Sequence, residues 1–435
     1  MLRVIASLLV ACCAFLAPVE PTVQRGLFLF LLAAGLWLTE ALHITVTALL
    51  VPVVAVGLRL LEPKQALAAF ADPVIALFFG GFVLASALRR HGIDAFIAAR
   101  VVRLARGRLL PAALLLFAAT AVISMWVSNT ASAAMMLPLA LGLLAGVDAE
   151  RERGTYLFVL LGIAWMASLG GMGTLVGSPP NALAGAATGL TFREWFAYGL
   201  PVMLLLVPGG ALVLWLLFRP GNPVVAPVAQ TFNWTNGARA ALAIFTLTVA
   251  GWLASSWLGE WLGIVRDLDS IIAVAAAVAL LATGTLGWKD VERDVEWGVL
   301  LLFGGGLCLG AVLKSSGASD WLGGSLLSGI AELPRIVVLL AMATFIVFLS
   351  ELASNTAATA LLLPLFLPLA PTLGMAPAEL AAFIALTASC GFMLPVATPP
   401  NAIVFGSGHV RQRDMMRAGL YMNIVCILVL TLFFA

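Results

Sequence analysis

Two short polar triplets are the residues of this chain best suited to chemistry, because each interrupts a long apolar stretch. The sequence SNT occurs at residues 128–130, within SNTASAAMMLPL, and again at 354–356, within SNTAATALLLPL. Asn donates through its amide and Ser and Thr through their hydroxyls, and all three also offer oxygen atoms as acceptors. Such groups in apolar surroundings can bind an anion or a small hard cation. Their repetition in matched contexts indicates that the two triplets act as a pair.

Each triplet is followed by a break that no helix can cross, at GSPPNA (177–182) and ATPPNA (397–402). Proline lacks an N–H group and clashes with the preceding helical turn. Unpaired backbone groups are costly in hydrocarbon, so such a break is tolerated only inside protein or beside a water-filled cavity. The freed carbonyls, together with Ser and Asn oxygens of the triplets, would suit sodium. A soft metal is not favoured, because no Cys–His ligand set accompanies them.

The residues after each triplet and after each Pro-Pro pair are expected to begin new half-helices. A helix N-terminus presents free N–H groups and the positive end of the helix dipole, which together attract anions. The four interruptions contain no Lys or Arg. The sequence therefore predicts an anion site built from helix ends, in which each triplet holds one carboxylate of a dicarboxylate.

The composition indicates the surroundings of these motifs. Of 435 residues, 62% are hydrophobic and 10% are charged, whereas a soluble domain carries about 25% charged residues. Apolar runs long enough to cross a bilayer cover most of the chain. We therefore predict an all-α polytopic membrane protein. The net charge of +2 gives no indication of a nucleic-acid partner, and the five cysteines lack metal-ligand spacing.

We expect about eleven transmembrane helices and two re-entrant hairpins. The hairpins, 109–146 and 334–370, each carry a triplet in the middle. The expected spans are 4–18, 25–41, 44–60, 73–89, 155–190 (interrupted), 198–218, 239–258, 270–287, 297–313, 378–408 (interrupted) and 415–434. The first is expected to be a membrane helix and not a cleaved signal peptide, because many spans follow it.

The chain repeats itself beyond the triplets, since LFFGG at 77–81 matches LLFGG at 301–305. Each copy contains five spans and a hairpin, so two consecutive copies must have opposite orientations in the bilayer. Inverted repeats with broken helices are typical of secondary transporters. The predicted organisation is a first helix (1–22), repeat 1 (23–218), a cytoplasmic linker (219–238) and repeat 2 (239–435).

Lys and Arg residues predict the orientation, because they are enriched in cytoplasmic loops. Six arginines lie between residues 89 and 108, so this segment is expected to be cytoplasmic. Counting outward from it places the N-terminus in the cytoplasm and the C-terminus on the opposite face of the cell (inner) membrane.

The contexts SMWVSNT (124–130) and SELASNT (350–356) resemble the divalent-anion:sodium symporter family, which includes dicarboxylate, citrate and sulfate carriers. The resemblance extends over nearly the whole chain. It implies a homodimer in which the domain that carries the hairpins moves vertically as an elevator.

The resemblance also implies roles for individual residues. One sodium ion would be held by Ser124, Ser128, Asn129 and the carbonyl of Gly177, and a second by Ser350, Asn355 and the carbonyls of Ala353 and Ala397. The anion would contact Asn129, Thr130, Asn355 and Thr356 within the two triplets, beside Ser128 and Ser354, with Ser178, Thr398 and Pro399 nearby.

The leading hypothesis is sodium-coupled symport of a small dianion, a C4-dicarboxylate such as succinate. A dianion held without a basic side chain in a low-dielectric site requires compensating cations, so at least two sodium ions are expected. Transport of sulfate or citrate and sodium-independent dicarboxylate exchange stay open. A proton antiporter would need a pair of buried carboxylates, and only Glu351 is apparent. An intramembrane hydrolase is not expected, because His43, His91 and His409 lie at span ends.

Overall fold

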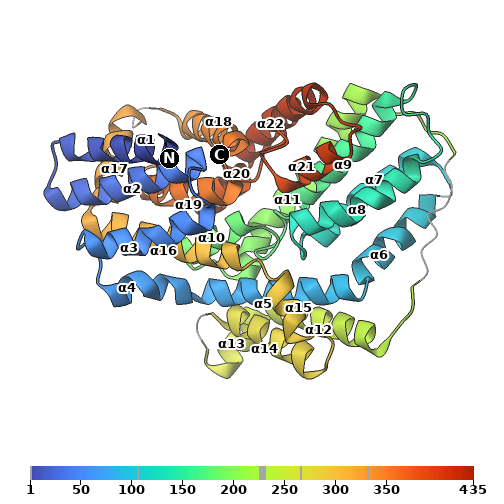
Figure 1. Ribbon diagram of the computed structural model, residues 1–435, viewed down its shortest axis with the longest axis horizontal. Helices are drawn as coiled ribbons and strands as arrows, with labels where there is room; N and C mark the ends of the chain where they lie inside the picture. The colour runs from blue at the N-terminus through green and yellow to red at the C-terminus, as the bar shows by residue number, and fades with distance from the viewer. Residues whose placement is uncertain (1, 106, 225–231, 265–266, 331–332) are drawn as a thin grey trace.

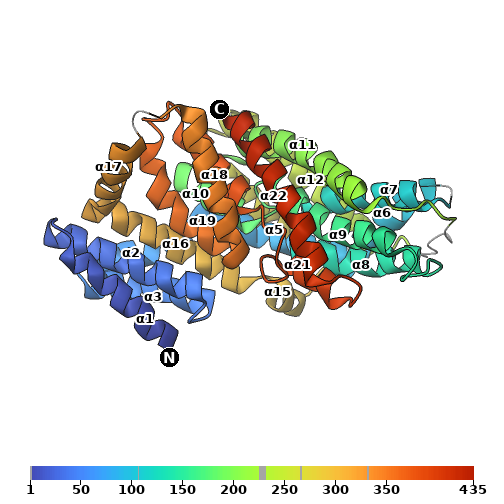
Figure 2. The ribbon, with the colours of Figure 1, turned by 90° about the horizontal axis from the view of Figure 1, so that it is seen from above.

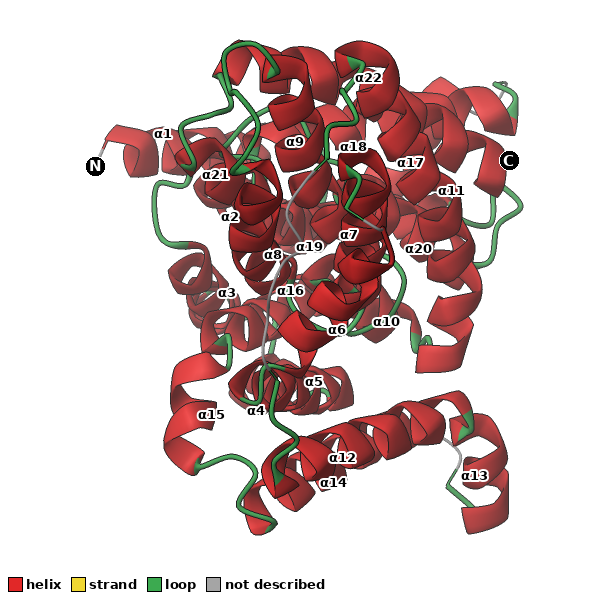
Figure 3. Cartoon of the chain, turned by 90° about the vertical axis from the view of Figure 1, so that its right-hand side faces the viewer, coloured by secondary structure: helices red, strands yellow, loops and turns green. Residues whose placement is uncertain are grey.

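The computed structural model describes residues 2–105, 107–224, 232–264, 267–330 and 333–435. Figure 3 shows that the regular structure of these residues is helical. Within the described ranges, the only β-type pairing is an isolated bridge between Arg108 and Val224. The prediction of an all-α fold is confirmed. The predicted linker is described only in part, because residues 225–231 lie outside the described residues, as does Arg106.

The first part of the chain contains the first triplet and the first break. Its helices are α1 (Leu2–Cys12), α2 (Pro21–Thr39), α3 (Ile44–Gly57), α4 (Pro63–Ala68), α5 (Pro73–Arg90), α6 (Ile93–Val102), α7 (Leu109–Ser124), α8 (Asn129–Leu144), α9 (Arg153–Gly170), α10 (Pro179–Thr188) and α11 (Phe192–Phe218). Short 3₁₀ turns follow α1, α4 and α6 at Cys13–Leu16, Ala69–Ala71 and Arg103–Ala105.

The second part repeats much of this order. Its helices are α12 (Asn236–Leu253), α13 (Ser255–Leu262), α14 (Leu268–Ala282), α15 (Trp288–Asp294), α16 (Trp297–Ser316), α17 (Ala318–Ile330), α18 (Arg335–Leu352), α19 (Asn355–Phe366), α20 (Pro377–Ala388), α21 (Pro399–Gly406) and α22 (Gln412–Phe434). A 3₁₀ turn, Leu367–Leu369, follows α19. The series from α5 to α11 thus corresponds, helix for helix, to the series from α16 to α22.

Seven helices among the described residues are long and apolar enough to cross a membrane, or eight if α12 and α13 form one span. The seven include α9, which ends at the first break, and α18, a hairpin limb. They leave out shorter apolar helices such as α3 and α14, which have 14 and 15 residues. The expected number of eleven spans therefore stays a prediction.

The span predicted at 239–258 is not one straight helix, because the chain bends by 75° between α12 and α13. The Trp252 indole N–H donates to the carbonyl of Asp269 over 2.9 Å, which ties the end of α12 to the start of α14. Beyond this bond, Trp257 and Trp261 of α13 are 66% and 75% exposed. Exposed tryptophans suit a helix that lies at the membrane surface.

Glycines allow two helix pairs to pack closely between the two halves of the chain. Helix α5 packs along α14, and α16 packs along α3 (Figure 1). A Cβ atom on Gly80 would lie 2.4 Å from the Ala273 carbonyl oxygen, and one on Gly305 would lie 2.5 Å from the Ala48 Cβ. Each half of the chain therefore supplies one glycine that the other half covers.

The half-helices also exchange partners between the two halves. Helix α8, which follows the first triplet, packs on α21, which follows the second break. Helix α19, which follows the second triplet, packs on α10, which follows the first break. This crossed arrangement brings both triplet-bearing hairpins into one assembly with both breaks.

Contacts between loops separate the helix ends into two groups. In the first group, Arg90 pairs with Asp290 and Arg153 pairs with Asp414, and the Leu109 N–H donates to the Pro223 carbonyl over 3.1 Å. In the second group, Arg335 pairs with Glu379 over 3.0 Å, and the Phe192 N–H donates to the Asp269 carboxylate over 2.8 Å. Each group joins loops that the predicted topology places on the same face of the membrane.

Candidate functional site

The first triplet lies at the tip between α7 and α8. Helix α7 ends at Ser124 and α8 begins at Asn129, with the Ser128 hydroxyl accepting the Ala131 N–H over 3.4 Å as an N-cap. The Ser124 hydroxyl lies 2.9 Å from the Asn129 Oδ1 and 2.6 Å from the Ala167 carbonyl oxygen. This tip is therefore tied to the end of α9, where the first break begins.

Oxygen atoms of the first triplet and the first break converge on Gly171. A Cβ atom there would lie 2.2 Å from the Asn129 Oδ1 and 2.9 Å from the Gly177 carbonyl oxygen. Of the residues implied for the first sodium site, Ser124, Asn129 and Gly177 thus lie together, and Ser128 lies beside them as the cap of α8. Only a glycine at position 171 leaves this space free.

The second triplet has a similar relation to the second break. A Cβ atom on Gly391 would lie 3.3 Å from the Ala397 Cβ, 3.5 Å from the Ser350 carbonyl oxygen and 3.6 Å from the Asn355 Oδ1. The Ser350 hydroxyl donates to the Val347 carbonyl of its own helix over 2.9 Å. The residues implied for the second sodium site therefore surround Gly391, with Ala353 buried at the hairpin tip.

The Asn355 Oδ1 is buried and has no hydrogen-bond partner among the described residues. Buried polar oxygens are normally paired, with protein, water or a bound ion. Its counterpart, the Asn129 Oδ1, is paired with Ser124. An unpartnered carbonyl oxygen beside Gly391 fits the chemistry of a hard cation, which takes oxygen ligands.

The asparagine of each Pro-Pro-Asn motif braces its break. The Asn181 amide donates to the carbonyls of Gly171 and Thr174 over 2.8 and 2.7 Å. The Asn401 amide donates to the carbonyls of Gly391 and Leu394 over 3.2 and 3.0 Å. Both side chains reach the residues ten and seven positions earlier in the chain, so the two breaks have the same internal geometry.

Glu351 braces the second break in a further way. Its carboxylate accepts the backbone N–H groups of Phe392, Met393 and Leu394 over 2.7, 2.9 and 3.1 Å, and the Asn423 amide over 2.7 Å. The first half has no carboxylate at the corresponding position, which is Met125; there the Met125 carbonyl accepts the Thr174 hydroxyl instead. The two predicted cation sites therefore differ in nearby charge.

The residues implied for anion binding differ in exposure. Thr130 and Pro399 are exposed, as is Val396 of the second break at 81%. By contrast, Thr356 and Ser178 are buried. Of the others, Ser354 and Ser128 are partly buried at the tips, and Thr398 is buried and caps α21 by accepting the Asn401 N–H over 3.4 Å. The exposed members of the predicted site thus lie at the starts of α8 and α21.

Sequence reasoning missed several residues that build the site. Gly171, Gly391, Asn181 and Asn401 were not among the predicted site residues, and Glu351 was noted without a partner. The repeated Asn after each Pro-Pro pair was the available signal. The two glycines also stand at matched positions, ten residues before that Asn, but the oxygen atoms that approach them are apparent only in the structure.

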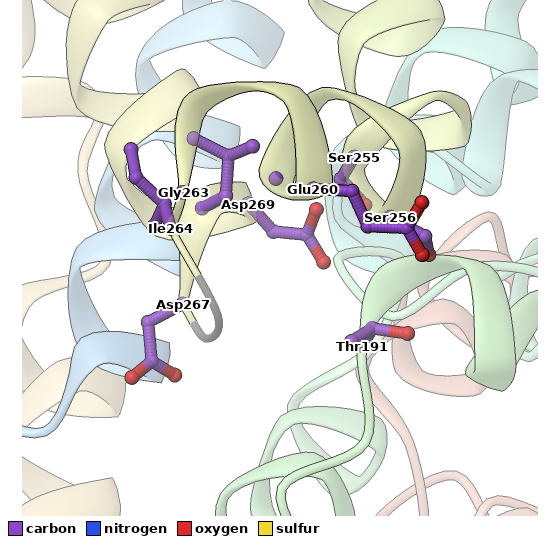
Figure 4. A pocket seen from close by; sticks show the side chains of 10 residues that line it. Thr191, Ser255, Ser256, Glu260, Gly263, Ile264, Asp267 and Asp269 are labelled. Atoms are coloured by element: carbon purple, nitrogen blue, oxygen red, sulfur yellow. The ribbon is translucent and has the colours of Figure 1, made fainter.

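An acidic cavity of about 410 Å³ lies between α13, the start of α14 and the start of α11, away from the triplets. In Figure 4 the Asp269 carboxylate points into the space below α13, near Thr191. Glu260 and Asp267 also line this cavity. Carboxylates repel a dianion, so this cavity does not suit the predicted substrate.

The three histidines do not form a catalytic group. His43 accepts the Thr45 N–H over 3.3 Å, His91 contacts the Thr285 carbonyl over 3.1 Å, and the His409 ring lies 5.0 Å from that of Tyr156. The three histidines therefore have separate partners in different parts of the fold.

Comparison with known proteins places the chain in a family. The model of the CitMHS citrate-transporter family matches residues 34–387. A sodium-dependent dicarboxylate transporter, SdcS, from Staphylococcus aureus is 30% identical over 91% of this chain and 82% of its own length. The chain belongs to the divalent-anion:sodium symporter family. The relatives of the chain in this family are transporters and not enzymes.

Two further proteins resemble this chain, one in sequence and one in fold. An uncharacterized transporter from Haemophilus influenzae is 49% identical over 95% of this chain and 91% of its own length. The crystal structure of the YdaH transporter from Alcanivorax borkumensis superposes with a TM-score of 0.62 and covers 95% of this chain and 96% of that one. At 17% identity, the likeness to YdaH establishes the fold alone.

Proposed function

We propose that this protein is a secondary active transporter that carries a C4-dicarboxylate such as succinate together with sodium ions. The observation that carries the proposal is the pairing of each Ser-Asn-Thr tip with its own Pro-Pro-Asn break around a glycine. The Asn129 Oδ1 of the tip and the Gly177 carbonyl oxygen of the break approach Gly171. The Ser350 carbonyl oxygen and the Asn355 Oδ1, both from the tip, approach Gly391, where the break contributes the Ala397 Cβ. One oxygen cluster in each half suits two sodium ions.

The charge of the site supports coupling to a cation. The triplets and breaks contain no Lys or Arg, so a dianion there depends on helix N-termini and on bound cations. Moving an uncompensated dianion out of water is very costly. Two sodium ions would neutralise it, and sodium would then be required for tight binding of the anion.

The names of relatives support the same substrate class. The Staphylococcus aureus relative is named as a sodium-dependent dicarboxylate transporter, whereas the matched family model is named for citrate. Citrate is therefore the second candidate substrate. Sodium-independent exchange is disfavoured, because the oxygen-bearing residues of both cation sites are present.

We further propose that the structure represents a state open to the cytoplasm. The exposed Thr130 and Pro399 lie at the starts of α8 and α21. On the predicted map, both helices run from the bilayer centre toward the cytoplasmic face. The elevator movement, the homodimer and the cytoplasmic N-terminus belong to the same proposal.

The test is uptake of radiolabelled succinate by proteoliposomes with and without an inward sodium gradient. We expect sodium, but not potassium, to stimulate uptake. We expect unlabelled succinate to compete more strongly than citrate or sulfate. The Asn129→Ala and Asn355→Ala variants should lose uptake while they stay folded, as judged by size-exclusion chromatography.

Specific results would contradict each part of the proposal. Succinate uptake that is indifferent to sodium would overturn the coupling. Stronger competition by citrate would transfer the substrate assignment to citrate. Normal uptake in both asparagine variants would remove the site assignment.

A further inference from the structure

A groove of about 510 Å³ lies between α10, α16, α17 and α19, which are neighbours in Figure 2. It opens beside Pro377, at the start of α20, on the face that holds the Arg335–Glu379 pair. Its deep end is closed where α16 meets α10 and α19. A Cβ atom on Gly306 would lie 3.1 Å from the Ala360 Cβ and 3.4 Å from the Leu183 Cδ2.

The walls of this groove are apolar. They include Ala186, Leu307, Ala311, Leu363 and Pro364, whose backbone groups lie within helices. Water gains few hydrogen bonds along such walls, and removing apolar surface from water is favourable by about 25 cal/mol per Å². The groove therefore favours an apolar occupant, and a dianion would be a poor one.

The polar side chains that line the groove are confined to its outer rim. Lys314 lies in the last turn of α16, and Ser319 and Asp320 lie in the first turn of α17. Lys314 and Asp320 are both exposed, and the described part of the chain shows no ion pair for either. From Lys314 to Gly306 the groove runs along α16 for roughly 12 Å at 1.5 Å per residue.

The rim and the walls together match one class of molecule. A zwitterionic aminophospholipid has an acyl chain, a phosphate and an ammonium group. The acyl chain fits the apolar walls, the phosphate can pair with Lys314, and the ammonium group can pair with Asp320. An acidic phospholipid would satisfy Lys314 but would lack a partner for Asp320.

We propose that this groove binds one acyl chain of a zwitterionic aminophospholipid, whose headgroup is held by Lys314 and Asp320. The groove is lined by Leu183 of α10 and Ala360 of α19, and both helices begin at a break or a triplet. A chain in this position separates α16 from α10 and α19 above their contact at Gly306. The lipid thus fills the crevice between these helices. The proposal does not depend on which anion is transported.

The experiment uses the full-length protein in nanodiscs that contain a phosphatidylethanolamine with a photoreactive group near the end of one acyl chain. After illumination, cross-linked peptides are mapped by mass spectrometry. We expect cross-links to concentrate on residues 306–311 of α16 and 360–366 of α19. Excess unlabelled phosphatidylethanolamine should suppress them, and phosphatidylglycerol should suppress them less.

Variants test the role of the rim charges. Lys314→Ala should reduce cross-linking at these segments about fivefold, as expected for one basic residue at a lipid headgroup, and Asp320→Ala should remove the preference for phosphatidylethanolamine. The matched control is the pair Arg335→Ala and Glu379→Ala on the same face, which should leave the cross-links unchanged. Ala311→Trp, which fills the groove, should abolish them in protein that still elutes as a single species.

Several results would overturn the proposal. Cross-links spread evenly over all lipid-facing helices would show that the groove is not a site. Equal suppression by phosphatidylglycerol would remove the role of Asp320. Displacement of the label by succinate would make the groove an entry route for substrate, and cross-links between two copies of the chain would make it a protein interface.

Discussion

Asn181 and Asn401 occupy the same place relative to their helix breaks, and each one donates to two carbonyls within its break. The Thr174 and Leu394 carbonyls also accept the N–H groups of Gly177 and Ala397, so each amide reinforces a backbone turn. The amide therefore stabilises the shape of each break from within the chain itself. The same motif was visible in the sequence, but its two acceptors were not.

Replacing either asparagine by alanine should destabilise the protein. Buried side-chain hydrogen bonds in membrane proteins contribute about 1–2 kcal/mol at most, so Asn181→Ala and Asn401→Ala should each lower the thermal unfolding temperature in detergent. The control is Asn236→Ala, at an exposed position at the start of α12. An equal unfolding temperature for all three variants would contradict the bracing role.

Glu351 gives the second break a charge that the first lacks. Its two carboxylate oxygens accept four N–H groups, and hydrogen bonds to an ionised group are stronger than neutral ones. In Glu351→Gln, an amide NH₂ would face one of these donors. The loop that carries Ala397 would then be held less firmly beside Gly391.

We therefore expect Glu351→Gln to shift the sodium dependence of uptake to roughly tenfold higher concentration, the equivalent of about 1.4 kcal/mol. The measurement is a sodium titration of succinate uptake. The matched variant Glu379→Gln removes a carboxylate that pairs with Arg335 at a helix end, and it should keep the original titration curve. Identical curves for both variants would argue against a role for Glu351.

At the scale of helices, one glycine decides how closely α5 can approach α14. A Cβ atom on Gly80 would lie 2.4 Å from the Ala273 carbonyl, whereas one on the neighbouring Gly81 would make ordinary contact with Val176 at 3.4 Å. The Ala273 carbonyl belongs to a helix backbone and cannot move aside alone. The fold should therefore tolerate a methyl side chain at Gly81 but not at Gly80.

Gly80→Ala should destabilise the fold by about 1–3 kcal/mol, the usual cost of overpacking, while Gly81→Ala should have little effect. Thermal unfolding of the two purified variants in the same detergent provides the comparison. Equal stabilities of the two variants would mean that α5 and α14 can move apart without a cost in the free energy of unfolding.

Much of the helix arrangement could be predicted from the sequence. The hairpin tips at Ser128 and Ser354 and the breaks before Pro179 and Pro399 coincide with the observed helix starts, because polar and proline interruptions in apolar runs have few other solutions. The bend after Leu253 could not be predicted. The hydrogen bond between Trp252 and Asp269 beside this bend joins two separate helices, and such a contact leaves no local signal in the sequence.

At the scale of the whole molecule, the two groups of loop contacts allow the orientation to be tested. In a background without the native cysteines, Arg100→Cys in α6 and Thr372→Cys after α19 introduce exposed thiols. An impermeant maleimide should label position 372 in intact cells and position 100 only in inside-out vesicles. The reverse pattern would invert the proposed topology while leaving the fold intact.

The two glycine-mediated helix contacts, α5 on α14 and α16 on α3, have a consequence for how such a chain could arise. Gly80 is covered by Ala273, and Gly305 by Ala48, so each half completes a surface of the other. If one half of the chain were produced alone, the helix face that carries its glycine would be exposed to lipid. Both halves would have to be produced together for that face to be covered. An ancestral protein of half this length would have needed a sister molecule inserted upside down, and gene fusion would then have locked the two opposite insertions into one polypeptide.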